Sequence, residues 1–170
     1  MGSCLSYVQT QTTTQTNTQE VDKNLSIPDG LKRKGLPKYT PQITSGRVVD
    51  VYDGDTMTLA ARVPGDNTIY QFQLRLHGLD CAEMKTKNPS EKLVAIKAKE
   101  YVESCVLNKI VNLENVALDK YGRLLANVKY GEHNLDLGEG LLVGRMAVEY
   151  DGGTKICPTN WMEYYASGTM

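Results

Sequence analysis

The sequence predicts an α+β protein in which a small five-stranded β-barrel packs against helices and follows a disordered N-terminal tail. Three observations support this fold class. Short runs rich in β-branched and apolar residues recur between Asp, Gly and Asn turns. One longer stretch has apolar residues at a helical period, and residues 1–40 have neither pattern. With 170 residues, 41% of them hydrophobic, the chain is long enough for one small core.

The N-terminal tail is predicted from composition. Residues 9–19 read QTQTTTQTNTQ, without a charged or apolar residue, so this segment cannot bury enough surface to offset the entropy lost on ordering. We therefore expect a disordered tail at 1–40, a barrel domain at 41–158 and a short C-terminal segment at 159–170. A basic patch near the end of the tail consists of Lys32, Arg33, Lys34 and Lys38.

Three strands are predicted at the start of the domain. Residues 46–52 and 56–63 flank the turn Asp53-Gly54-Asp55, and residues 69–77 form the third strand. The third strand alternates between an apolar face and a polar face, which predicts one buried side. The apolar side chains are Phe72, Leu74 and Leu76, and the polar ones are Gln73, Arg75 and His77.

A helix is predicted at 90–108, with Ser90 as the N-cap. Two further strands at 110–117 and 123–130 and a short helix at 135–144 follow. Short strands interrupted by a helix are typical of a barrel of the OB type with packed helices. The apolar stripe of the first helix consists of Val94, Ala98, Tyr101, Val102 and Cys105.

Composition restricts the class of function. The formal net charge is −1 and the pI about 6.1, which argues against a passive nucleic-acid coat but not against an enzyme with charge at its cleft. The four cysteines, at 4, 81, 105 and 157, have neither zinc-site nor disulfide-framework spacing, so we expect a reducing compartment. The sequence has no apolar run of membrane-spanning length and no secretory signal at its start.

Carboxylates concentrate in two segments where the chain turns. The first holds Asp53 and Asp55, and the second holds Asp80 and Glu83. Hard cations such as Ca²⁺ and Mg²⁺ prefer carboxylate and carbonyl oxygens, which both segments offer. Either segment alone is more commonly an ordinary solvated turn.

Two arginines complete the candidate site. Arg75 lies mid-strand on the polar face, and Arg123 follows the turn Asp119-Lys120-Tyr121-Gly122. Each alone reads as a surface arginine, but a guanidinium also binds phosphate oxygens bidentately.

In order and spacing, DGDT at 53–56, RLHGLDCAE at 75–83 and DKYGR at 119–123 resemble the staphylococcal nuclease family over roughly residues 45–155. The resemblance implies a calcium-dependent endonuclease that hydrolyses DNA and RNA with little sequence preference, acting on single-stranded or frayed substrate as a monomer. It implies Asp55, Asp80 and the Cys81 backbone carbonyl as Ca²⁺ ligands, Asp53 acting through water, Arg75, Glu83 and Arg123 as catalytic residues, and Lys120 and Tyr121 as substrate-phosphate contacts.

The sequence departs from the family pattern in two places. Cys81-Ala82 stands where the family has Thr-Pro or Ala-Pro, and the absent proline is expected to loosen this loop. The basic C-terminal helix of the family is reduced to a short segment, expected to cap the core, with Trp161, Tyr164 and Tyr165.

The start of the chain carries a candidate lipid anchor. Met1-Gly2-Ser3-Cys4-Leu5-Ser6 fits the myristoylation pattern at Gly2, with Cys4 as a palmitoylation site. With both acyl chains we expect association with the cytoplasmic face of a membrane, and without them a cytoplasmic protein. The alternative function is a non-catalytic OB-fold module that binds nucleic acid or protein while tethered to a membrane. The complete set of catalytic residue types favours the enzyme.

Overall fold

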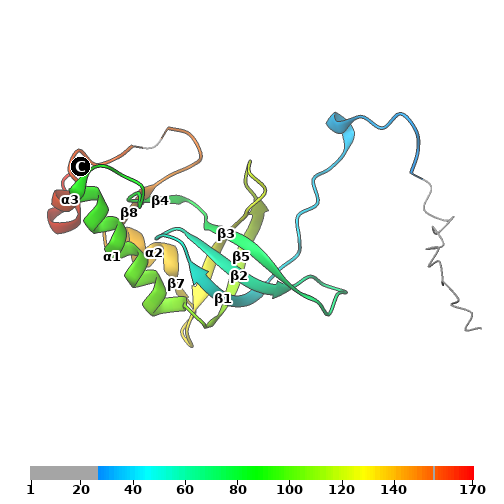
Figure 1. Cartoon of the computed structure of the whole chain (residues 1–170), viewed down its shortest axis with the longest axis horizontal. Coiled ribbons are helices and arrows are strands. Elements are labelled where there is room, and N and C mark those ends of the chain that lie inside the picture. The colour runs from blue at the N-terminus through cyan, green and yellow to red at the C-terminus, as the bar shows by residue number, and fades with distance from the viewer. Residues whose placement is uncertain (1–26, 155) are drawn as a thin grey trace, which may run out of the picture. The chain divides into compact units, whose positions relative to one another are not determined.

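The computed structural model describes residues 27–154 and 156–170 (Figure 1). The chain divides into two compact units between Lys38 and Tyr39. In the first unit, the described residues form one 3-10 turn, η1, at Arg33–Gly35. Tail disorder over 1–26 and the acylation sites Gly2 and Cys4 fall outside the described residues, and the predicted domain limits at 40 and 158 stay predictions.

The second unit contains the predicted five-stranded barrel. Its strands follow the order β3-β2-β1-β5-β6, and a parallel pairing of β3 with β6 closes the sheet (Figure 1). The OB-type α+β fold is therefore confirmed. The bounds are β1 Ser45–Val51, β2 Thr56–Arg62, β3 Ile69–Leu76, β5 Ile110–Leu118 and β6 Leu124–Tyr130.

Alternation decides which side of each barrel strand is buried. Leu59 of β2 and Leu74 of β3 are each 0% exposed, whereas Gln73 and His77 are exposed, as the sequence predicts. β3 ends at Leu76, one residue earlier than predicted, because Gly78 adopts a left-handed φ of 80° that turns the chain.

Helix α1, Pro89–Val106, begins and ends earlier than predicted. Its N-cap is Asn88 and not Ser90, because the Asn88 side chain accepts hydrogen bonds from the backbone N–H of Ser90 and Glu91. Pro89 occupies the first helical position, where its missing N–H costs no hydrogen bond. The predicted apolar stripe faces the barrel, with Tyr101 and Cys105 half-buried at its margin.

Four elements, β4, β7, β8 and α3, were not predicted. β4, Leu79–Cys81, pairs antiparallel with β8, Ala147–Glu149. β7, Leu135–Asp136, precedes the predicted short helix, α2, which spans Leu137–Val143. The C-terminal segment forms α3, Trp161–Ser167, which packs against α1 (Figure 1). Trp161 is 2% exposed and caps the core as expected.

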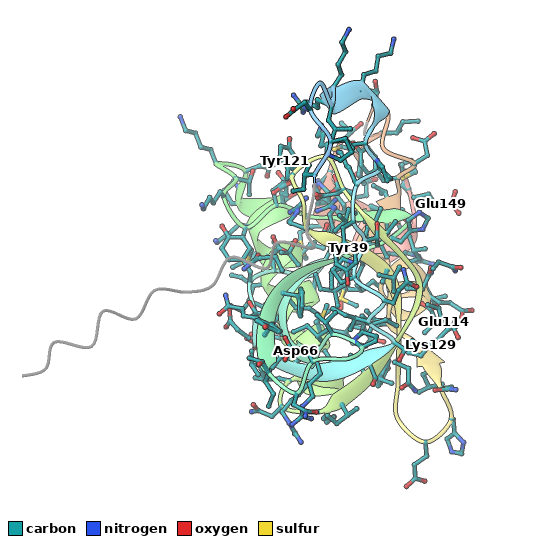
Figure 2. All side chains as sticks on the ribbon, turned by 90° about the vertical axis from the view of Figure 1, so that its right-hand side faces the viewer. Tyr39, Asp66, Glu114, Tyr121, Lys129 and Glu149 are labelled. Carbon is teal, nitrogen blue, oxygen red and sulfur yellow. The ribbon has the colours of Figure 1, made fainter. Side chains whose placement is uncertain are left out.

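On the outer surface of the barrel, β5 and β6 carry a cross-strand charge cluster. Lys129 Nζ lies 3.0 Å from Asp136 Oδ2 and 4.0 Å from Glu114 Oε2. Figure 2 shows Lys129 and Glu114 next to each other and away from Asp66, which lies in the β2–β3 turn. None of the helices in the described part of the chain has the length and apolar character needed to span a bilayer.

Candidate active site

Six of the predicted site residues line one cleft of about 440 Å³, called here the arginine cleft. Three segments line it: the chain from the end of β3 through β4, the turn between β5 and β6, and residues 150–152 after β8. These segments are distant in sequence and are brought together by the β3–β6 and β4–β8 pairings. The predicted residues in its lining are Arg75, Asp80, Glu83, Lys120, Tyr121 and Arg123.

Asp55 lies behind the cleft, 3% exposed, at the start of β2. Its Oδ1 accepts from Thr56 Oγ1 at 2.8 Å, its Oδ2 accepts from the Cys81 N–H at 3.1 Å, and its backbone carbonyl accepts from Leu76 N–H. A Cβ on Gly54 would lie 2.7 Å from Ala98 Cβ and 2.8 Å from Cys81 Sγ. The turn can therefore seat Asp55 against α1 and β4 only because residue 54 is glycine.

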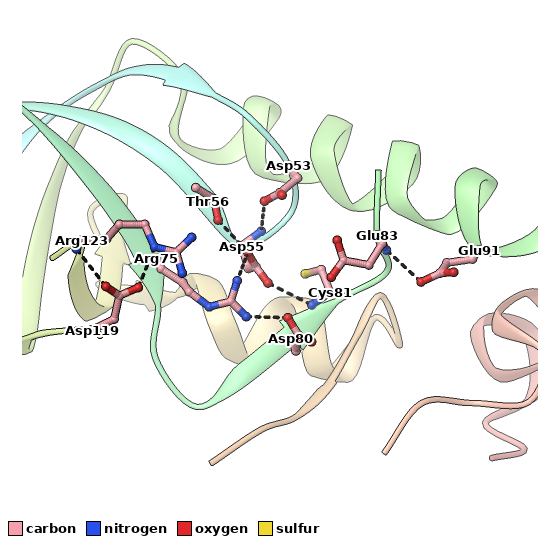
Figure 3. Close-up of polar contacts among 10 residues, drawn as sticks. All are labelled: Asp53, Asp55, Thr56, Arg75, Asp80, Cys81, Glu83, Glu91, Asp119 and Arg123. Carbon is pink, nitrogen blue, oxygen red and sulfur yellow. Dashed lines mark hydrogen bonds and ion pairs between the residues drawn. The ribbon is translucent and has the colours of Figure 1, made fainter. Parts of the chain in front are cut away.

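Arg75 bridges the two predicted metal ligands. Its Nη1 donates to Asp55 Oδ1 at 2.8 Å and its Nη2 to Asp80 Oδ1 at 2.5 Å (Figure 3). These contacts use two of the five N–H groups of a guanidinium, so donors remain for an anion in the cleft. Arg75 thus connects two carboxylates from different segments and also lines the cleft.

The carboxylates suit a hard cation. Burial raises the pKa of Asp55 to about 7 despite the opposing charge of Arg75, and the charge of Asp53 adds to the rise. A cation beside this buried group would favour its ionised form, and carboxylate oxygens are the donors that Ca²⁺ prefers. Within the described ranges, no three His, Cys, Asp or Glu side chains gather as a metal cluster. Asp55 and Asp80 nevertheless both contact the guanidinium of Arg75.

The backbone of Cys81 faces Asp55. Tyr150 N–H donates to the Gly78 carbonyl and Ala82 N–H to the Met146 carbonyl across the β4–β8 pair. Alternate residues of an antiparallel pair exchange hydrogen bonds, so Cys81, opposite Ala147, directs its N–H and carbonyl away from β8. The Cys81 N–H indeed donates to Asp55. Its carbonyl therefore points to the side where the predicted ligands lie.

Asp119 positions Arg123, a role that sequence reasoning missed. Its Oδ2 accepts from Arg123 Nε at 2.6 Å, and its Oδ1 accepts the backbone N–H of Tyr121 and Arg123 at 2.8 and 2.9 Å (Figure 3). Burial by itself would raise the pKa of the Asp119 carboxyl. The hydrogen bonds from Arg123 and Tyr121 have the larger effect, so the pKa lies below its ordinary value. The carboxylate thereby fixes both the turn and the guanidinium.

Aromatic contacts complete this turn. The Arg123 guanidinium lies 5.4 Å and Lys120 Nζ 5.1 Å from the centroid of the Tyr121 ring. Tyr121 is 73% exposed. Its ring therefore contacts both cations of this turn.

Glu83 is exposed on the loop between β4 and α1. Its backbone N–H donates to Glu91 Oε1 at 3.1 Å, and Lys92 Nζ donates to the Met84 carbonyl at 2.5 Å. Side chains of the first turn of α1 thus hold the loop, although the family proline is absent. Asp53 lies outside the cleft lining, and its Oδ1 accepts the Asp55 N–H at 3.2 Å.

The cleft lining also includes Tyr150, Asp151 and Gly152, which lie far from every predicted motif. They follow the short strand β8, which had no recognisable pattern, so no signal in the sequence linked them to the site. His77, predicted to face outward beside Arg75, also lines the cleft.

An OB-type barrel with two arginines and several carboxylates in one cleft defines a protein suited to binding phosphate esters beside a cation. A model of the staphylococcal nuclease homologue family matches residues 73–157, half of the chain. The chain belongs to this family. A probable endonuclease from Schizosaccharomyces pombe is 30% identical over 94 residues. The aligned part covers 52% of this chain and 41% of that relative.

Proposed function

We propose that the protein is a calcium-dependent endonuclease that hydrolyses phosphodiester bonds in DNA and RNA with little sequence preference. The observation that carries the proposal is the arginine cleft itself, where Arg75 of β3 and Arg123 of the β5–β6 turn lie beside Asp80 and Glu83. Family membership and the similarity to a probable endonuclease support it.

The two arginines would bind the scissile phosphate. Asp119 contacts Arg123 through Nε, which leaves the two terminal nitrogens to form a fork for phosphate oxygens. Charge builds on these oxygens as water attacks, and preorganised donors stabilise it where it develops. Lys120 and Tyr121, which also line the cleft, would contact the neighbouring phosphates of the strand.

The carboxylates would divide into two roles. Asp55, Asp80 and the Cys81 carbonyl would hold the Ca²⁺, with Asp53 acting through water. When bound, the ion would neutralise charge on the phosphate and orient a water molecule. Glu83, exposed in the cleft, would accept a proton from the attacking water at a carboxylate oxygen.

A nuclease assay tests the proposal. Single-stranded DNA should be cut in Ca²⁺ and left intact in excess chelator. Asp55→Asn should abolish cutting and leave the fold intact, because the amide keeps the size of the side chain and its oxygen can still accept from the Cys81 N–H. The amide NH2 then faces the Thr56 hydroxyl, which can rotate to accept from it. Full activity in chelator would contradict metal dependence. Absence of cutting with any divalent cation would favour the alternative of a non-catalytic binding module.

We also propose that acylation at Gly2 and Cys4 tethers the protein to the cytoplasmic face of a membrane. The support is the sequence pattern at residues 1–6 together with the basic patch at residues 32–38. Without acylation the protein would be cytoplasmic.

A further inference from the structure

A second groove lies at the other end of the β2–β3 hairpin. It measures about 490 Å³, and its lining includes two arginines and several apolar side chains. Arg47 Nη1 donates to the Asn108 carbonyl at 2.5 Å, and Arg62 Nε donates to the Asn67 carbonyl at 2.9 Å. Each guanidinium is thus held by one backbone contact and keeps donors for an anion. The apolar lining includes Ala60, Pro64, Ile69 and Ile110.

The register of β2 and β3 connects this groove to the arginine cleft. Met57, Leu59 and Leu74 point into the core, so the alternate residues of both strands lie on the opposite face. On that face Thr56 and Thr58 are themselves buried, and the exposed surface is provided by Arg62, Gln71 and Gln73. On this face, the cross-strand pairs begin with Thr56 opposite Arg75, next to the arginine cleft, and end with Arg62 opposite Ile69, at the second groove. We call this face the β2–β3 strip; between its ends lie Thr58, Ala60, Gln71 and Gln73.

The charge of the strip suits a nucleic-acid backbone. Gln71 and Gln73 are exposed and uncharged, and Arg47 pairs with Ala60 beside them. Two acidic residues border the strip. Asp50 of β1 is in register with Thr58, and the carboxylate of Asp66 already accepts hydrogen bonds from Tyr70 Oη and Thr68 N–H. The β5–β6 surface is less suitable, since Lys129 there is already paired with Asp136 and lies near Glu114 (Figure 2).

We propose that the β2–β3 strip is an extended substrate-binding surface, along which a single strand bound at the arginine cleft continues to the second groove. Arg47 and Arg62 would bind backbone phosphates there, and the exposed Ile69 and Ile110 would contact bases. Six residue steps from Ile69 to Arg75 span about 20 Å, which is roughly six stacked nucleotides. This inference rests on the proposed function in taking nucleic acid as the ligand.

Substrate length provides the test. We expect Arg62→Gln and Arg47→Gln each to raise KM about three- to fivefold for a single-stranded DNA of about 12 nucleotides, the scale of an exposed ion pair. Neither should change kcat, and neither should change cleavage of a dinucleotide, which is too short to reach the groove. Arg62→Lys should retain most of the binding. Lys99→Gln, which removes the same charge from α1, is the matched control.

Binding measured in chelator separates failure of this inference from failure of the proposed function. In fluorescence anisotropy, each Gln variant should lower the salt dependence of binding to the longer DNA by about 0.7 in log–log slope per lost phosphate contact. This holds even if the protein proves unable to cut. Wild-type affinity and salt slope in both Gln variants, with native thermal melting, would overturn the inference. Arginine-dependent binding to phosphatidylserine vesicles without an effect on DNA would overturn it too and indicate a membrane contact.

Discussion

At the residue scale, the contact between Asp119 and Arg123 shows how a single carboxylate organises the site. Arg123 alone is a long, mobile side chain whose ordering costs entropy. Asp119 accepts from its Nε and from its backbone N–H, so the guanidinium is oriented before substrate binds. For the proposed hydrolysis, such preorganisation would matter most in the transition state, where phosphate charge is greatest.

We therefore predict that Asp119→Asn lowers kcat by about 10- to 100-fold, with a smaller change in KM, because the amide nitrogen that replaces Oδ2 cannot accept from Arg123 Nε. The Asn oxygen can still accept the Tyr121 and Arg123 backbone N–H groups, so the turn should keep its shape. Steady-state kinetics with circular dichroism would measure this. Arg123→Lys should be at least as impaired, and wild-type turnover in either variant would refute the role of that residue.

Gly54 provides a second prediction at the residue scale. Gly54→Ala should lower the free energy of unfolding by about 1–3 kcal/mol, because the new methyl group would overlap Ala98 and Cys81. Activity should fall as well, since relief of the clash displaces the neighbouring Asp55. Urea unfolding measures the first effect. Gly35→Ala, where a Cβ meets no atom within 4 Å, should leave stability nearly unchanged and serves as the control.

At the element scale, the sequence was informative where periodicity was strong. The five barrel strands and α1 were predicted within about two residues because alternation and helical spacing persist over several turns or pairs. Strands β4 and β8 are three residues each, too short for a period, and their pairing depends on contacts distant in the sequence. The error at the N-cap has a local cause: Asn88-Pro89-Ser90 offers two good caps, and Pro89 at the first helical position favours Asn88.

Helix α2 provides a prediction at this scale. Asp136 Oδ1 accepts the Glu139 N–H at 2.9 Å as N-cap, and Asp136 Oδ2 lies 3.0 Å from Lys129 Nζ. Asp136→Ala should lower the free energy of unfolding by about 1–2 kcal/mol at neutral pH. Asp136→Asn should lose less, because an amide oxygen still caps the helix.

The effect of Asp136 should depend on pH. Burial raises the pKa of Asp136, but the Glu139 N–H and the Lys129 ammonium outweigh it and hold the pKa below the ordinary 3.8. A carboxylate whose pKa is lower in the folded state than in the unfolded state stabilises the fold at pH values above 3.8. This stabilisation is lost as the pH falls through the pKa of the folded state. The difference between wild type and Asp136→Ala in urea unfolding should therefore shrink below pH 3.8. A difference that stays constant through this range would contradict the assignment.

At the scale of the whole molecule, the sequence predicted the residue types of the site but not their connections. The motifs indicated Asp55, Arg75, Asp80 and Arg123, and the fold does bring their segments together. That Arg75 bridges two carboxylates depends on side-chain rotamers and strand pairing, which no linear pattern encodes. The cleft residues after β8 were missed for the same reason, since the β4–β8 pairing alone carries them to the site.

The last prediction concerns the tail and the membrane. One myristoyl chain holds a protein only marginally, whereas a second acyl chain or a basic patch makes anchoring stable. Expressed in eukaryotic cells, the protein should fractionate with membranes, Gly2→Ala should release it, and Cys4→Ser should leave weaker, reversible binding. Because every motif of the candidate site lies beyond residue 50, neither substitution should change cleavage of soluble DNA. Mass spectrometry of the N-terminus decides the outcome, since an unmodified Gly2 in such cells would eliminate the anchor.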